Sequence, residues 1–198
     1  MQLPAAAFAG LEQATIEAWV RWADFSYYSQ WFAFGVDGGW QSLGINHYYT
    51  TSRLLFYIYD RHRKLYVAVA ASNLPTDQWC HMAAVSGSAG MKLYLNGMLV
   101  GDNAYGGSFA AIDSTGDNYL GHSHWWDNFD FRGALDEVRV WGVARSGEQI
   151  RAGMHRRLQG DETGLRGLWN FDAGTADDAS PNGYHGQLEG DAHCGCEG

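Results

Sequence analysis

The chain of 198 residues contains little proline and little cysteine, with three residues of each. It is also poor in basic residues. Three cysteines are too few for a fold held together by disulfides. Basic residues number 13 against 22 acidic ones, and the resulting net charge of −9 disfavours a protein that binds nucleic acid. No apolar run approaches the roughly 20 residues that cross a bilayer, so we expect no membrane insertion.

The ends of the sequence carry few signals. Met1–Phe8 lacks a basic leader and is too short for a signal peptide, so none is expected here. Cys194 and Cys196 are two residues apart, which is too close for an easy mutual bridge. Cys80 falls in a strand-like run and is interpreted as a small core residue, with a bridge from Cys80 to the tail as the alternative.

Aromatic residues and glycine are abundant. Aromatics make up 15% of the chain and glycine numbers 26, a mixture typical of many strands joined by tight turns. Most of the chain alternates with period two: Ile16, Ala18 and Val20 share one face of a strand, while Glu17 and Trp19 share the other. This pattern predicts antiparallel sheets in a single domain.

Turn residues indicate two hairpins. Asn96-Gly97 lies between alternating apolar runs, and both residues tolerate the positive φ that a two-residue hairpin loop requires. Leu54–Tyr59 and Leu65–Ala70 flank the basic cluster Arg61–Lys64, which we interpret as a solvated hairpin tip.

One helix is predicted near the C-terminal third. Ser146 can cap it, with Gln149 completing a capping box, and it should end near Met154 or His155. Further strands are predicted at Tyr119–Gly121, Ala134–Trp141, Gly167–Phe171 and His185–Leu188.

Five pieces of sequence carry a resemblance to a known family. They are, in order, Thr15–Arg21, Trp79–Ala83, Met91–Gly97, Phe131–Trp141 and Gly164–Asp172. Together they resemble the laminin G-like, concanavalin A-like jelly-roll family from about Leu3 to about Gly190. The resemblance implies an all-β fold, a two-sheet antiparallel β-sandwich with one short helix. We therefore expect one domain over residues 1–190 and a C-terminal tail over 191–198. Only Gln2–Pro4 match the family's opening strand.

The resemblance also implies a calcium ion. Many relatives hold one partly through an aspartate at the position that matches Asp136, and Glu12 is the nearest acidic partner in sequence. Calcium prefers about 6–8 hard oxygen ligands. If the strand is regular, Asp136 points the same way as Val138 and Val140. The alternative is that Asp136 is a hydrogen-bonded link between strand and loop.

Five further polar residues have interpretations of their own. Glu17 and Arg139 fall on the non-core sides of their strands, which favours a cross-strand ion pair over a catalytic role. His81 follows Trp79 in a strand and is interpreted as a hydrogen-bonded structural histidine. His122 and His124 would face one side of an extended segment, a workable metal geometry that lacks an evident third ligand.

Aromatic residues gather in three segments that we predict to be loops. They are Tyr27–Trp31, Asp37–Trp40 with Asn46–Tyr49, and His122–Asn128. Tyrosine and tryptophan offer a flat apolar face with a polar handle, which matches the CH faces and hydroxyls of a sugar. The candidate ligand-binding residues are Trp31, Trp40, Tyr48, Tyr49, His124, Trp125, Trp126 and Asp127. We expect them to converge at one rim of the sandwich and bind a glycan; contact with a protein, or simple packing of the loops, are the alternatives.

Enzymatic activity is not expected. Concanavalin A-like glycoside hydrolases use two carboxylates about 5–5.5 Å or 6.5–9.5 Å apart. Asp136 and Glu137 are adjacent and should face opposite sides, and no nucleophile elbow, P-loop or dinucleotide fingerprint occurs. The sequence therefore predicts a non-catalytic recognition module of a larger extracellular or cell-surface protein. Its expected partner is a glycan or a protein surface, with calcium as a structural cofactor.

Overall fold

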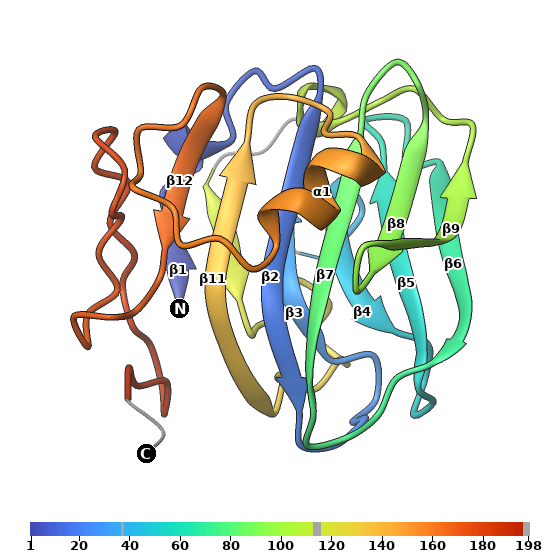
Figure 1. Ribbon diagram of the computed structural model, residues 1–198. Helices are drawn as coiled ribbons and strands as arrows, with labels where there is room; N and C mark the ends of the chain where they lie inside the picture. Colours follow the sequence, from blue (N-terminus) through green and yellow to red (C-terminus); the bar gives the residue numbers. More distant parts are fainter. Residues whose placement is uncertain (37, 113–115, 196–198) are drawn as a thin grey trace.

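The computed structural model describes residues 1–36, 38–112 and 116–195, and they form two antiparallel sheets packed face to face (Figure 1). Sheet A has the order β1-β10-β3-β4-β5-β6. Its strands are β1 (Gln2–Leu3), β3 (Gln30–Gly35), β4 (Ser42–His47), β5 (Arg53–Tyr59), β6 (Leu65–Asn73) and β10 (Asp117–Leu120). The predicted all-β sandwich is confirmed.

Sheet B has the order β12-β11-β2-β7-β8-β9 and faces the viewer in Figure 1. Its strands are β2 (Ala14–Trp22), β7 (Trp79–Ser86), β8 (Met91–Leu95), β9 (Met98–Asn103), β11 (Gly133–Trp141) and β12 (Leu165–Trp169). Short 3-10 helices, η1 and η2, span Ala5–Ala7 and Phe109–Ala111. The one α-helix in the described ranges, α1 (Gly147–Gly153), lies across the outer face of sheet B over β2 and β7 (Figure 1).

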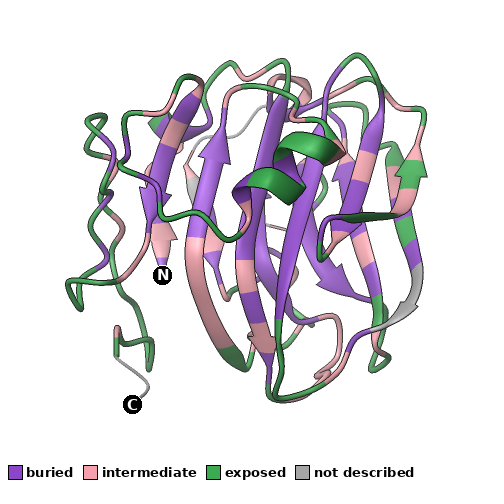
Figure 2. Ribbon diagram, in the orientation of Figure 1, coloured by how far each residue is buried: buried purple, intermediate pink, exposed green. Residues whose placement is uncertain are grey.

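The core lies between the sheets, where the strands are mostly buried (Figure 2). Phe8 stacks on Phe109 with ring centroids 5.2 Å apart, and Phe34 meets the Phe109 ring edge-on at 4.6 Å. Each fully buried ring of this kind contributes about 1.5–3 kcal/mol through the apolar surface it removes from water. The core therefore joins η1, η2 and sheet A into one body.

Both hairpins are confirmed. Leu95 pairs with Met98 around Asn96 and Gly97, whose φ angles are 48° and 75°. Tyr59 pairs with Leu65, and the basic residues 61–64 between them are exposed.

The helix α1 begins where the capping box predicts. The Ser146 hydroxyl accepts a hydrogen bond from the Gln149 amide (3.2 Å), and the Gln149 side chain accepts one from the Ser146 amide (2.8 Å). A buried side chain, Ile150, packs the helix against Ala83, Val85 and Tyr94 of sheet B.

Charged residues are buried beneath α1. Glu17 and Arg139 lie directly opposite each other on β2 and β11, and both side chains are at most 1% exposed. The Glu17 carboxylate accepts hydrogen bonds from Arg145 (2.6 Å) and the Trp141 indole (2.8 Å), while the Arg139 guanidinium lies 3.8 Å away. Burial raises the pKa of Glu17, and the two arginines oppose that rise. The predicted cross-strand ion pair is confirmed, as part of a larger network.

Arg139 connects this network to the end of α1. Its guanidinium donates to the carbonyls of Gly153 (3.0 Å) and Arg156 (2.7 Å) and to the Glu137 carboxylate (2.8 Å). The last carbonyls of a helix lack partners within it, so a buried guanidinium is an effective way to satisfy them. Arg139 therefore fastens α1 and the following segment to sheet B.

His81 is structural, but its ring is not hydrogen-bonded as predicted. The ring is 1% exposed and meets Trp19 edge-on, while its Nε2 lies 3.7 Å from Glu17 Oε2 and its Nδ1 has no hydrogen-bond partner. Burial and the nearby arginines lower the pKa of His81 to about 3, so the ring is neutral at pH 7.

Some predicted strand boundaries are wrong. The last strand is Leu165–Trp169 rather than Gly167–Phe171, and residues 185–188 contribute only an isolated bridge between Gln2 and Gln187.

The thiol of Cys80 is free and buried, which confirms the interpretation of Cys80 as a core residue. The thiol of Cys194 is also free, and that residue is partly buried. Cys196 lies outside the described residues. Within those residues, no helix has the length and apolar character needed to span a bilayer.

Candidate functional site

The segment of residues 121–132, which follows β10, folds over the outer face of sheet A. Ala33, Gly44 and Tyr57 lie directly opposite one another on β3, β4 and β5, so they share that face. A Cβ on Gly44 would lie 2.6 Å from the Tyr57 ring and 2.7 Å from Gln30 Oε1. Glycine at this position lets polar side chains and the covering segment approach the sheet closely.

Ser123 joins the segment to the sheet. Its hydroxyl accepts hydrogen bonds from the Gln30 side chain (2.9 Å), the Trp125 amide (3.1 Å) and the Asn128 side chain (3.0 Å). Gln30 in turn accepts from the Tyr57 hydroxyl (3.1 Å). Because Gln30, Tyr57 and Ser123 are buried and mutually bonded, they hold the segment in one conformation.

A tryptophan cluster lies at the turn between β3 and β4. The Trp125 ring contacts Trp40 at 5.1 Å and Tyr59 at 5.5 Å between centroids. Gly39 lies beneath it, with a φ of 72°, and a Cβ there would come within 2.0 Å of Trp125. Trp40 keeps 48% of its surface exposed.

A tyrosine cluster lies at the opposite end of the same two strands, before β3 and after β4. Tyr28 contacts Tyr27, Tyr48 and Tyr49 with centroids 4.9 to 5.8 Å apart. Burial and the neighbouring tyrosines raise the pKa of Tyr28 to about 12, so the hydroxyl is neutral at pH 7. Tyr48 and Tyr49 are 41% and 47% exposed.

The covering segment also carries exposed groups of its own. Trp126 is 90% exposed, more than any other large apolar side chain of the described residues. Phe129 is 62% exposed. Asp127 is exposed, and it raises the pKa of the Tyr27 hydroxyl after burial and the neighbouring Tyr49, which are the larger causes. The amide of Phe129 donates to the Tyr27 carbonyl (3.1 Å), which fixes this end of the segment beside the tyrosine cluster. We call the exposed rings of Trp40, Trp126, Phe129 and of Tyr48 and Tyr49 the aromatic face.

The structure corrects the expected arrangement. Tyr48 and Tyr49 lie at one end of the β3–β4 pair and Trp40 at the other, so the aromatic residues follow the outer face of sheet A instead of meeting at one rim. Trp31 is 0% exposed and belongs to the core, and His124 is 4% exposed. Neither side chain is available to stack on a ligand, because both are buried.

Other residues of this region were not predicted. Tyr59 and Ser123 hold the tryptophan cluster and the segment, and Phe129 adds an exposed ring. Tyr57 and Tyr59 alternate with core residues in β5, and that period-two spacing is a sequence signal for their shared outer face. No sequence pattern marks Phe129.

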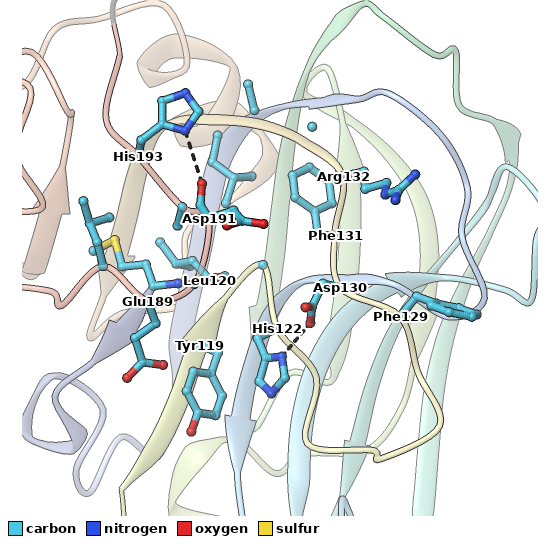
Figure 3. Close-up of a pocket in the computed structure, with 18 of the residues that line it drawn as sticks. Tyr119, Leu120, His122, Phe129, Asp130, Phe131, Arg132, Glu189, Asp191 and His193 are labelled. Carbon is cyan, nitrogen blue, oxygen red and sulfur yellow. Dashed lines mark hydrogen bonds and ion pairs between the residues drawn. The ribbon is translucent and has the colours of Figure 1, made fainter.

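A cleft of about 1340 Å³ adjoins the tyrosine cluster, since Tyr27 is one of the residues that line it. Figure 3 shows part of its lining. One wall is formed by Phe129, Asp130 and Arg132 of the covering segment, and the other by Glu189, Asp191 and His193 near the C-terminus. Tyr119 and His122 lie at its base, where the His122 ring binds Asp130 at 2.6 Å.

The predicted calcium pair does not fit one ion. β2 begins at Ala14, and Asp136 of β11 lies opposite Trp19, so at least five strand residues, or more than about 15 Å, separate Glu12 from Asp136. A bulge at Glu137, whose φ is 50°, turns Asp136 onto the outer face of sheet B, away from the side of Val138 and Val140. Burial raises the pKa of Asp136, and its carboxylate accepts the Glu137 amide (2.8 Å).

The histidine pair does not form a metal site either. His122 is exposed and paired with Asp130, whereas His124 is buried, and both rings contact Tyr119. No cluster of three or more histidine, cysteine, aspartate or glutamate side chains suited to a metal ion occurs in the described part of the chain.

Comparisons with known proteins agree on the fold. The sequence model of the concanavalin A-like lectin/glucanases superfamily matches residues 1–151. Pappalysin-1 of Mus musculus is 32% identical over 106 residues, which cover 50% of this chain and 6% of that protein.

Two solved structures show the same architecture. A Bacteroides ovatus protein assigned as a carbohydrate binding protein is similar with a TM-score of 0.71 at 22% identity, over 94% of this chain and 57% of that one. Ruminococcus gnavus IT-sialidase CBM40 bound to α2,3 sialyllactose is similar with a TM-score of 0.65 at 15% identity, over 75% of this chain and 85% of that one. The chain thus spans a small part of pappalysin-1 and about half of the Bacteroides chain.

Proposed function

Because the chain belongs to the concanavalin A-like lectin/glucanases superfamily, we propose that it is a carbohydrate-recognition module that binds through the aromatic face. The observation that carries the proposal is the exposure of this ring set, with Trp126 at 90% and Trp40 at 48%. Exposed apolar side chains that gather in clusters mark interaction sites, whereas single exposed ones need no partner. A sugar supplies the partner, since its CH face stacks on a ring and its hydroxyls bind nearby polar groups.

The surroundings of the rings favour binding by a preformed surface. Ring-to-ring contacts hold Trp40 against Trp125, and the Ser123 hydrogen bonds fix the segment that carries Trp126. A ligand that meets a preorganised surface loses less binding energy to ordering the protein. Asp127, Tyr48 and Tyr49 are exposed, so their carboxylate and hydroxyl groups can form hydrogen bonds to sugar hydroxyls.

We also propose that the module is not catalytic. The carboxylates that line the cleft, Asp130, Glu189 and Asp191, are exposed. A glycosidase general acid needs a carboxyl group that burial keeps protonated, and these positions do not offer such burial. The buried carboxylates have structural partners. Glu17 lies under α1, bonded to arginine and tryptophan. Asp178 accepts the Leu168 amide, and Asp60 accepts the amides of His62 and Lys64.

A glycan array tests the proposal. The intact domain should bind at least one glycan class, and Trp126→Ala and Trp40→Ala should each weaken that signal. Trp79→Ala is the matched control, because Trp79 is 41% exposed but lies on β7 of sheet B. If no glycan binds, the aromatic face serves contact with a protein surface, which was the alternative from the sequence.

This proposal places the domain outside the cell or on its surface, as part of a larger protein. Glycans are concentrated there, and the curated relative is far longer than this chain. Labelling of intact cells that express the full-length protein tests the location: reagent that does not cross membranes should reach the domain.

A further inference from the structure

The cleft beside the aromatic face has the dimensions of a binding site for several sugar units. Its volume of about 1340 Å³ exceeds that of a typical small-molecule site. Phe129 and Tyr27 line it and also border the tyrosine cluster, so the cleft and the aromatic face are continuous. A chain of sugars seated on the face can extend into the cleft without a break.

Both walls present rings and polar groups. Phe129 and Phe131 stand on the side of the covering segment, and Tyr119 lies at the base (Figure 3). The His122–Asp130 pair and His193, whose Nδ1 lies 3.3 Å from the Asp191 carbonyl, add hydrogen-bonding groups. Alternating rings and polar side chains suit a ligand that is apolar on its faces and polar at its edges.

The charges in the cleft are predominantly negative. Three carboxylates line it, those of Asp130, Glu189 and Asp191. The guanidinium of Arg132 lies 3.5 Å from the carboxylate of Asp24, so this cation already has an acidic partner. The Met1 amino group donates to the Leu120 carbonyl (2.9 Å); burial lowers its pKa, and the carboxylates of Glu189 and Asp130 oppose that fall. On the covering-segment wall, Asp130 is paired with the His122 ring and stands beside Arg132, so the surplus of negative charge comes from Glu189 and Asp191 of the C-terminal wall. An anionic ligand would therefore meet unfavourable charge from that wall.

We propose that the cleft holds an uncharged stretch of a glycan and makes the module select neutral glycans over sialylated ones. This inference rests on the proposed carbohydrate recognition and adds the substrate class. Sialic acid carries a carboxylate, which the acidic C-terminal wall repels, whereas neutral sugars present only hydroxyls to the same groups. The expected preference is at least roughly tenfold, because like charges brought together in an interface are strongly unfavourable.

The test uses an array of glycan cores, each printed in a neutral form and with a terminal α2,3-linked sialic acid. The wild-type domain should bind the neutral form at least about tenfold more tightly, and higher ionic strength should reduce that ratio through screening. The triple variant Asp130→Asn, Glu189→Gln, Asp191→Asn should bring the ratio close to one. Replacing the exposed acids Glu12, Asp161 and Glu148, none of which lines the cleft, by their amides should leave the ratio as in the wild type.

The outcomes separate the two proposals. Tighter binding of the sialylated forms, or a ratio that the triple variant does not change, overturns the cleft inference while carbohydrate recognition stands. Absence of binding to every glycan overturns both. Loss of the neutral preference in the triple variant, together with loss of binding in Trp126→Ala, supports both.

Discussion

Replacing Arg139 by methionine should strongly destabilise the domain. The side chain is 1% exposed, and its guanidinium binds Glu137 and the carbonyls of Gly153 and Arg156. Methionine matches much of its length but satisfies none of these acceptors, and the Glu17 carboxylate loses one of its two cationic neighbours. Removing one partner of a buried ion pair costs about 3–5 kcal/mol, so we expect a loss of about 4 kcal/mol.

Urea unfolding followed by tryptophan fluorescence measures the loss. With a slope of about 2 kcal/mol per molar urea, the midpoint should fall by about 2 M. The matched control is Arg157→Met, since Arg157 also forms a short ion pair, with Asp172 at 2.6 Å, but is 72% exposed. An exposed ion pair contributes about 0–1 kcal/mol, so the urea midpoint of the Arg157→Met variant should barely change. Equal effects of the two substitutions, or a loss below about 1 kcal/mol for Arg139→Met, would refute the account of how α1 is held.

Three further predictions concern pH, the tryptophan cluster and calcium. His47 and His81 have pKa values lowered by burial to about 4 and about 3. As the pH falls, these histidines therefore take up protons in the unfolded chain before they do so in the folded one. Each should lower the free energy of unfolding by about 1.4 kcal/mol at pH 5.5 relative to pH 7.5 and above. Urea midpoints at the two pH values check this, and a pH dependence that His47→Gln and His81→Gln leave unchanged would contradict it. Gly39→Ala should displace Trp125 and weaken glycan binding several-fold, because the new Cβ would lie 2.0 Å from the indole; titration calorimetry beside a Gly10→Ala control, where no atom lies within 4 Å, decides it. Chelation with EDTA should leave the thermal midpoint unchanged, since Glu12 and Asp136 do not share one ion; a midpoint several degrees lower would reveal calcium bound by other ligands.

Residues with local signals could be predicted from the sequence. The Asn96-Gly97 hairpin and the capping box of Ser146 and Gln149 follow from local spacing and were found as expected, as was the placement of Glu17 and Arg139 on the non-core sides of their strands. Each depends on a turn, a cap or strand alternation, which a short stretch of sequence specifies by itself.

The strands β3 and β4 were harder to predict. Both are buried on both faces, because residues 121–132 cover the side that would otherwise face solvent. Strand alternation disappears under such cover, so Trp31 and the residues before Tyr48 were assigned to exposed loops. The bulge at Glu137 likewise depends on the pairing of β11 with β2, and it reversed the expected direction of Asp136.

The candidate surface could be predicted only in part. Trp40, Trp126 and the pair Tyr48 and Tyr49 are exposed as expected, but their placement along one face depends on the path of residues 121–132. That path is set by long-range contacts such as Gln30 with Ser123, which lie 93 residues apart in sequence. The cleft depends equally on distant segments, since its second wall comes from residues 188–195.

The most direct test of carbohydrate recognition is calorimetric titration of the intact domain with the strongest glycan from the array, compared with Trp126→Ala and Trp79→Ala. The account predicts that Trp126→Ala raises the Kd at least roughly tenfold, about 1.4 kcal/mol of lost stacking, while Trp79→Ala changes it less than about twofold. Equal Kd values for the wild type and Trp126→Ala, or a comparable loss in Trp79→Ala, would contradict binding through the aromatic face.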